Sequence, residues 1–160
     1  MPAMPDALVH CVNVTTARNL SPLFDEAVRQ ERPVLIVRGR REVGVLVSRA
    51  ATLRLLAPYR VQVDVLPDDA EGWTLWVREL NVGGTGPTPQ AARADLVSAV
   101  RAHILDYWEQ FDFYRHLPEM TAQEPYVLRL SLAQDNAELV ELLFGGQVSS
   151  ADEGPADAGE

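Results

Sequence analysis

The sequence of 160 residues predicts an α+β fold built as two small domains. Three observations support this prediction: two separate β-hairpin patterns, helical patterns between and after them, and a change of charge near residue 60. Residues 1–60 hold nine arginines and five acids, a formal charge of +4, whereas residues 61–160 hold five arginines and eighteen acids, or −13. The domains are predicted at 1–58 and 59–146. The remaining residues, 147–160, have four acids and no base and predict a disordered acidic tail.

The first domain begins with a predicted strand over residues 9–14, VHCVNV. A short turn at 16–20 is expected to follow. The next helix is predicted to have Ser21 as its N-cap and Pro22 at its first position, because a proline further inside a helix would remove a backbone hydrogen bond.

A β-hairpin is predicted in PVLIVRGRREVGVLV, with strands over 34–37 and 43–47 joined by an Arg-Gly-Arg-Arg turn. A second helix is expected from Arg49 to Leu56. It ends before Pro58, because the residue ahead of a proline disfavours helical backbone angles. A domain of about sixty residues is marginally stable alone, so self-association is expected.

The stretch VNVTTARNLSPLFDEAVRQERPVLIVRGRREVGVLVSRAATLRLL, residues 12–56, resembles the amino-terminal domain of Phd/YefM-type antitoxins in the order, spacing and type of its residues. Over about residues 9–57 this resemblance implies a β-α-β-β-α domain that dimerises, binds operator DNA and represses its own operon within a type II toxin-antitoxin system. Pro22 departs from the family pattern, since it lies inside the helix that such proteins use near DNA.

Seven residues are predicted to bind DNA. A helix amino-terminus offers free N–H groups and a partial positive charge to a phosphate. Arginine on a hairpin turn suits phosphates and guanine edges alike. The alternative is that these are solvated charges on a loop and a helix cap. The predicted DNA-binding residues are Thr15, Thr16, Arg18, Asn19, Arg38, Arg40 and Arg41.

The second domain begins with another predicted hairpin, in which RVQVDVLPD and WTLWVREL alternate apolar and polar residues around a turn at 68–72. The stretch NVGGTGPTPQ, residues 81–90, predicts a loop. A long helix is expected next, with Thr88 as N-cap and Pro89 at its first position, and it runs to about Tyr114. The residues predicted to pack on the sheet are Ala94, Val97, Val100, Ile104, Trp108 and Phe111.

Residues 63–104, VDVLPDDAEGWTLWVRELNVGGTGPTPQAARADLVSAVRAHI, resemble the HicB-like fold, a small sheet flanked by one helix that is found in many antitoxins. The familiar Pro-Gly-Cys of its loop is replaced here by Asn-Val-Gly-Gly at 81–84. Over about residues 61–115 this resemblance implies an interaction domain, available for a toxin or for self-assembly.

The segment 118–146 carries a charge of −4 and predicts a strand in PYVLRLSLA, residues 125–133, and a short helix closed by Gly145. Two interpretations stay open. The two elements complete the core of the second domain, or they expose apolar side chains that dock on a basic toxin, because opposite charge speeds encounter. On the second interpretation the toxin-binding residues are Leu139, Leu142, Leu143 and Phe144.

The sequence gives little support for catalysis, and no enzymatic activity is expected. The acidic cluster of Asp64, Asp68, Asp69 and Glu71 fits a solvated turn better than a metal site. The three histidines lack metal-ligand spacing, and the glycine-rich loop lacks a phosphate-binding motif. We therefore expect neither a metal nor another cofactor.

Cys11, the single cysteine, is interpreted as a buried hydrophobe, and no apolar run approaches the roughly twenty residues of a membrane span. Without a signal-peptide pattern, a cytoplasmic protein with no membrane partner is expected. The sequence thus predicts an antitoxin with three partners: operator DNA, a cognate toxin, and further copies of itself in a homodimer or higher homo-oligomer. The first alternative is an interaction or scaffold protein that has both folds and binds no DNA. The second is a metal-dependent nuclease-like sheet protein.

Overall fold

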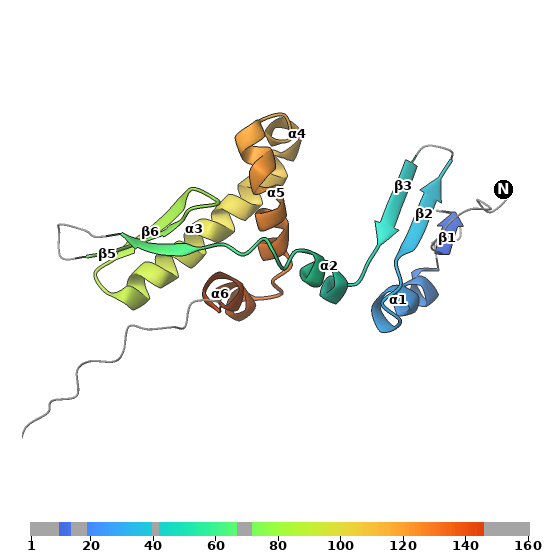
Figure 1. Ribbon diagram of the computed structural model, residues 1–160, viewed down its shortest axis with the longest axis horizontal. Coiled ribbons are helices and arrows are strands. Elements are labelled where there is room, and N and C mark those ends of the chain that lie inside the picture. Colours follow the sequence, from blue (N-terminus) through green and yellow to red (C-terminus); the bar gives the residue numbers. More distant parts are fainter. Residues whose placement is uncertain (1–9, 14–18, 40–41, 67–71, 146–160) are drawn as a thin grey trace, which may run out of the picture. The chain divides into compact units, whose positions relative to one another are not determined.

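The computed structural model describes residues 10–13, 19–39, 42–66 and 72–145. The chain forms two compact units, residues 1–58 and 59–160 (Figure 1). Each unit has its own three-stranded sheet and its own cluster of buried hydrophobic residues. The acidic tail predicted at 147–160 lies outside the described residues.

The first unit contains one three-stranded sheet and two helices. Strand β1 (His10–Asn13) pairs in parallel with β2 (Val34–Arg38), and β2 pairs in antiparallel with β3 (Glu42–Leu46), so β2 is the central strand. Helix α1 (Leu20–Arg29) connects the two parallel strands, and α2 (Arg49–Leu55) follows β3. The elements therefore follow in the order strand, helix, two strands, helix, as the sequence predicts.

Helix α1 begins at Leu20, two residues before the predicted first residue, Pro22. Its N-cap is Asn19, whose side chain makes no capping hydrogen bond, so the prediction of Ser21 as the cap was wrong. Pro22 is the third residue of the helix. The N–H groups of a first turn have no acceptor within the helix, so a proline there removes no helical hydrogen bond.

The end of α1 is tied to α2 by an ion pair. Glu31 has a φ of 53°, in the left-handed region, just after the helix. Arg54 donates from its Nη1 and Nη2 atoms to the two carboxylate oxygens of Glu31, at 3.2 and 2.7 Å. These bonds, with the charge of the guanidinium, lower the pKa of Glu31 below its ordinary value. The pair links the turn after α1 to helix α2.

The core of the first unit is small. Leu23 and Ala27 of α1 pack with Val34 of β2, and these three residues are buried. Ile36 and Leu46 are half-buried against them. Only one face of the sheet therefore lies under α1.

The second unit contains an antiparallel sheet of three strands in the order β4 (Val63–Leu66), β5 (Trp73–Val77) and β6 (Val82–Gly86). Strand β6 lies where the sequence predicts a loop over 81–90, so that prediction was wrong in part. The glycines of this strand make room for a helix. A Cβ atom on Gly84 would lie 2.3 Å from the backbone nitrogen of Leu96, and one on Gly86 would lie 2.5 Å from that of Ala92.

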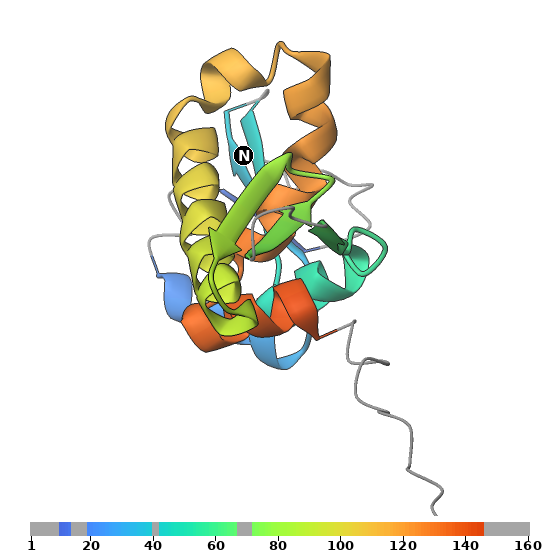
Figure 2. The same ribbon diagram turned by 90° about the vertical axis from the view of Figure 1, so that its left-hand side faces the viewer.

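Helix α3 (Pro89–Glu109) runs along the sheet (Figures 1 and 2). It begins as predicted, with Pro89 at its first position and the Thr88 hydroxyl accepting a hydrogen bond from the Ala91 N–H at 3.1 Å. It ends earlier than predicted. The helix is interrupted at Gln110, which caps its C-terminal end, and a separate short helix, α4 (Phe111–Tyr114), follows.

The buried face of α3 differs in part from the predicted one. Val100 and Ile104 are buried as predicted, and Val97 and Phe111 are half-buried against the core. Ala94 and Trp108 are exposed instead. The side chains that α3 buries are Ala92, Leu96, Val100, Ile104 and Tyr107.

Residues 118–131 form a helix, α5 (Pro118–Ser131), where the sequence predicts a strand over 125–133. Pro118 occupies the first turn, and Glu119 there suits the positive end of the helix dipole. The helix continues through Pro125, which removes one backbone hydrogen bond. Val127 and Leu130, three residues apart, are both buried on one face of the helix.

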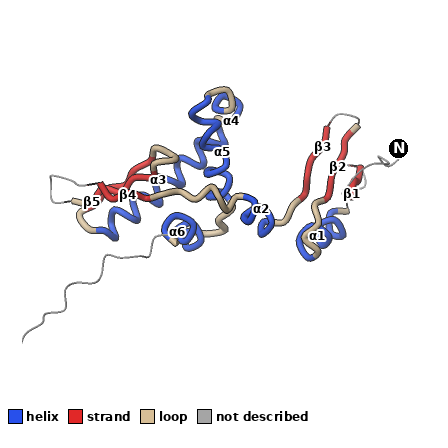
Figure 3. Tube along the Cα trace, in the orientation of Figure 1, coloured by secondary structure: helices blue, strands red, loops and turns tan. Residues whose placement is uncertain are grey.

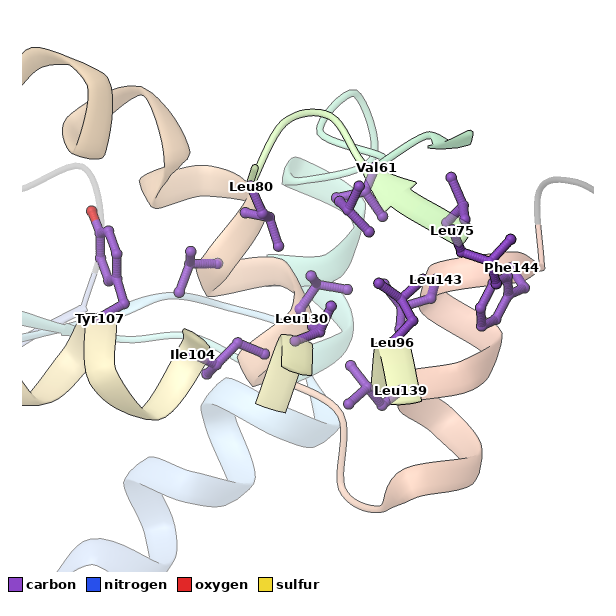
Figure 4. Packing of buried hydrophobic residues seen from close by; sticks show 14 of the residues in the cluster. Val61, Leu75, Leu80, Leu96, Ile104, Tyr107, Leu130, Leu139, Leu143 and Phe144 are labelled. Atoms are coloured by element: carbon purple, nitrogen blue, oxygen red, sulfur yellow. The ribbon is translucent and has the colours of Figure 1, made fainter. Parts of the chain in front are cut away.

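Helix α6 (Asn136–Phe144) completes the second unit, and Figure 3 shows that the unit is helical from α3 onward. The Asp135 carboxylate caps α6 by accepting from the Glu138 N–H at 2.8 Å. Leu139, Leu143 and Phe144 pack into the same cluster as Leu96 (Figure 4). The core of this unit therefore draws on strands, on α3 and on both C-terminal helices.

Candidate DNA-binding and partner-binding surfaces

Two of the seven predicted DNA-binding residues lie within the described part of the chain. Asn19 is exposed at the start of α1. Arg38 is the last residue of β2, its side chain is 75% exposed, and its Nε atom lies 3.4 Å from Glu42 Oε2. The predicted residues outside the described ranges are Thr15, Thr16, Arg18, Arg40 and Arg41.

The two elements that carry these residues lie apart. The β2–β3 turn is at one end of the first sheet, and α1 is at the other end (Figures 1 and 2). Gly39, at the start of the turn, has a φ of 64°, and no atom lies within 4 Å of where its Cβ would be. The space beside Gly39 is therefore open.

Several arginines of the first unit pair with acids on its surface. Arg29 Nε lies 3.2 Å from Asp25 Oδ1 within α1, and Arg54 binds Glu31. All four side chains are about half exposed or more. Exposed pairs of this kind stabilise a protein by roughly 1 kcal/mol at most. They therefore leave the arginines available to exchange a carboxylate for a phosphate.

The sequence reasoning missed a partly exposed apolar face on the first sheet. Leu46 pairs with Val34 on the face under α1, so alternation along the strands places Val43 and Val45 on the other face. There Val43 pairs with Val37, and Val45 pairs with Leu35. Val43 is 56% exposed and Val45 is 58% exposed. These four residues are called the open sheet face below.

The signal for this face was present in the sequence. A strand with one solvated face alternates apolar and polar residues. The stretches VLIV, residues 34–37, and VGVL, residues 43–46, have no polar side chain on either face of the strand. Strands of that kind are buried on both faces. In the first unit Leu35 and Val37 are half-buried, whereas Val43 and Val45 remain exposed, so the pattern points to further burial by another chain.

The structure contradicts the exposed C-terminal face predicted for toxin binding. Leu139, Leu143 and Phe144 are buried, and Leu142 is half-buried against the same core. Of the two interpretations open at the sequence level, completion of the core is the one observed. The apolar side chains of these four α6 residues stabilise the second unit and do not form an exposed docking surface.

The acidic cluster expected at the second hairpin lies only partly within the described residues. Asp64 accepts two hydrogen bonds from Arg78, at 3.2 and 2.8 Å, and its carboxylate is thus already engaged. Asp68, Asp69 and Glu71 lie outside the described ranges. Among the residues that are described, no three metal-ligating side chains gather into a site. None of the described helices is both long and apolar enough to cross a membrane.

Asp106, like Glu31, is an acid stabilised in its charged form. Tyr114 Oη donates to Asp106 Oδ2 at 2.7 Å, and Gln110 Nε2 donates to Oδ1. These hydrogen bonds lower the pKa of Asp106. The bond between Tyr114 and Asp106 also raises the pKa of Tyr114. The network holds α4 against the end of α3.

A lowered pKa in the folded state means that the ionised carboxylate favours folding. That contribution is fully present above the ordinary aspartate pKa of about 3.9 and is lost as the pH falls through the lower folded-state value. We therefore expect Asp106→Asn to flatten the loss of stability of the second unit below about pH 4. Urea unfolding followed by tryptophan fluorescence at several pH values would measure this. Asp112→Asn is the matched control, because the Asp112 side chain is fully exposed. Equal pH dependence in wild type and Asp106→Asn would contradict the assignment.

Comparison with known proteins gives one family and one solved structure. Residues 8–145 match the profile of the PHD-like family, described as antitoxin of toxin-antitoxin, RelE / RelB, TA system. The match spans both units. No curated protein shows significant sequence similarity to the chain. A crystal structure of an antitoxin part of a proposed toxin/antitoxin system from Syntrophomonas wolfei subsp. wolfei has a similar fold, with a TM-score of 0.69.

That structure is 20% identical in sequence, and the similarity covers 84% of this chain and 96% of the other. At this identity the likeness concerns the fold, and it extends over both units. The family profile covers most of the sequence in one continuous match. The chain belongs to the PHD-like family of antitoxins from toxin-antitoxin systems.

Proposed function

We propose that this antitoxin belongs to a type II system, binds operator DNA as an autorepressor through its first unit, and neutralises its toxin through its second unit. In this proposal the first unit is of the Phd/YefM type, the second is HicB-like, and the protein has no enzymatic activity of its own. The family membership supports a toxin as partner. The charge of +4 on residues 1–60 supports DNA as a partner of the first unit.

The observation that carries the proposal is the open sheet face. Its four apolar residues form two cross-strand pairs, Val37 with Val43 and Leu35 with Val45. The two valines of β3 are more than half exposed, and Leu35 and Val37 are half-buried. A second copy of the first unit, placing its own open sheet face on this one, would bury all eight side chains. A two-fold dimer of this kind presents two hairpin tips and two helix starts, which suits an operator with two half-sites.

The β2–β3 hairpin turn is proposed as one DNA contact. Arg38 is held at the end of a strand rather than on a flexible tail, and Arg40 and Arg41 follow it in the sequence. Each arginine that reaches a phosphate releases counterions, so the logarithm of the binding constant falls by about 0.9 per contact for each decade of salt. The slope of the logarithm of the binding constant against the logarithm of the salt concentration therefore reports the number of phosphate contacts.

We expect a variant with Arg38, Arg40 and Arg41 all changed to alanine to bind the duplex upstream of this gene at least about tenfold more weakly than wild type. Its salt slope should be smaller by between about one and three. Fluorescence anisotropy at low and moderate salt measures both quantities, with a scrambled duplex beside the upstream one. A matched variant with Arg78, Arg93 and Arg115 of the second unit changed to alanine should bind as wild type does.

The outcomes separate the parts of the proposal. An unchanged affinity and slope in the hairpin variant would remove the hairpin as a DNA contact, and the start of α1 would become the region to test next. Wild-type protein that binds neither duplex, or binds both equally, would contradict operator recognition. The first unit would then serve dimerisation alone, within an interaction protein.

A further inference from the structure

An apolar surface lies at the C-terminal end of α3 in the second unit. Leu105 is 67% exposed and Trp108 is 38% exposed, and residues three apart on a helix lie on the same face. Beside them is a hollow of about 230 Å³ between α3, the end of α5 and the start of α6. Its apolar lining residues are Ile104, Leu105, Leu130, Ala133 and Leu139. Leu105, Trp108 and this hollow are together called the α3 docking surface.

Trp108 is fixed in place although it is partly exposed. Its Nε1 donates to Ser131 Oγ at 2.7 Å, and Ser131 Oγ donates in turn to the Val127 carbonyl at 2.7 Å. The Trp108 ring packs edge-on against Tyr107, with centroids 5.4 Å apart, and lies 5.3 Å from the ring of Phe111. A tryptophan held by such contacts loses little conformational freedom when a partner covers it, which is a property of interface anchors.

Ser131 joins the anchor to the hollow. It accepts the hydrogen bond from Trp108, and it also lines the hollow. Leu105 belongs to both features in the same way, as an exposed residue of α3 and as part of the wall. The three parts are therefore one continuous feature, with a rigid aromatic ring at the edge of a cavity of side-chain size.

The charges around the α3 docking surface favour a basic partner. Glu109 is exposed one helical turn after Leu105, and Asp135 lines the hollow. Arg101 also lines the hollow, where it donates a hydrogen bond to Asn136 Oδ1. The last turn of α3 contains no basic residue, so the partial negative charge at the end of this helix of 21 residues is not offset within it. Residues 61–160 as a whole carry −13.

We propose that the toxin docks on the α3 docking surface, placing one apolar side chain in the hollow against Leu105 and Trp108 and basic side chains against Glu109 and Asp135. This inference rests on the proposed function, because it assigns the surface that meets the toxin. It moves the contact from the C-terminal helix predicted by the sequence to the exposed side of α3. The occupant is a protein with a basic surface around an apolar residue.

The test is the affinity of the full chain for the protein encoded by the reading frame adjacent to this gene, measured by isothermal titration calorimetry. Leu105→Arg should weaken binding at least about a hundredfold, because it fills the hollow and places a cation before a basic partner. Glu109→Arg should weaken it about tenfold, mainly through slower association that depends on salt. Val65→Arg is the matched control, since Val65 is 59% exposed on β4 of the same unit, and it should change the affinity by less than about threefold.

Each result has a distinct meaning. If wild-type chain does not bind this protein, toxin neutralisation fails, and the inference fails with it. If wild type binds and Leu105→Arg binds equally well, only the α3 docking surface is overturned. If Leu105→Arg instead lowers the oligomeric state of the chain alone, measured by light scattering, and leaves toxin affinity unchanged, this surface is an interface between copies and the inference is wrong.

Discussion

Replacing Gly84 by alanine is expected to lower the free energy of unfolding of the second unit by roughly 3 kcal/mol or more. The new Cβ atom would lie 2.3 Å from the backbone nitrogen of Leu96 and 2.5 Å from its Cα. Both atoms belong to the backbone of α3, so no change of rotamer relieves the overlap. Strand β6 and helix α3 would have to separate, and the fully buried Leu96 side chain lies at that contact.

Urea unfolding followed by tryptophan fluorescence reports the stability of the second unit, because Trp73, Trp76 and Trp108 all lie in that unit. Gly83→Ala is the matched comparison. A Cβ on Gly83 would meet the ring of Trp76 at 2.7 Å, which is a side chain that can move. We expect a smaller cost there, about 1 kcal/mol. A wild-type unfolding midpoint for Gly84→Ala would show that α3 does not approach β6 as closely as described.

Changing both Val43 and Val45 to aspartate is expected to abolish dimerisation through the open sheet face. Two carboxylates per chain would have to be buried against the same residues of another copy, at a cost of several kcal/mol. Within one chain the substitutions face solvent, since both valines are more than half exposed. The first unit should therefore keep its fold, and the change acts on association.

Loss of the dimer should weaken operator binding by roughly a hundredfold or more, because two linked DNA contacts gain that much from effective concentration. Light scattering gives the oligomeric state, and anisotropy gives the affinity for the upstream duplex. Leu55→Glu is the control, since Leu55 is 74% exposed on α2 rather than on the sheet. A double variant that remains dimeric would place the interface elsewhere and would remove the observation on which the proposed function depends.

The sequence was most informative where a turn or cap has a distinctive chemistry. The Arg-Gly-Arg-Arg turn located the first hairpin, and Thr88 with Pro89 correctly located the start of α3. Helix periodicity was less reliable. Ala94 and Trp108 are apolar and correctly spaced, yet they are exposed, because periodicity alone cannot tell the face that packs on the sheet from the one beside it.

The errors have physical causes that composition hides. Gly83, Gly84 and Gly86 looked like a loop, but two of these glycines are required by the close approach of α3 and are part of β6. The alternation in PYVLRLSLA suggested a strand. A helix that begins seven residues earlier, at Pro118, continues through this segment and buries Val127 and Leu130 instead. Which apolar residues of α6 face inward depended on tertiary packing that the sequence does not encode locally.

The division of the molecule into two separately cored units has a consequence for its evolution. Each unit keeps its buried residues within its own part of the chain, with the boundary after Pro58. A recombination event at that boundary would exchange one unit for a homologous one without cutting through either core. Under the function proposed above, such an exchange would change the operator preference of the first unit while the toxin pairing of the second unit is retained, or the reverse. On that proposal, selection on gene regulation and selection on protection from the toxin would act on different halves of one gene.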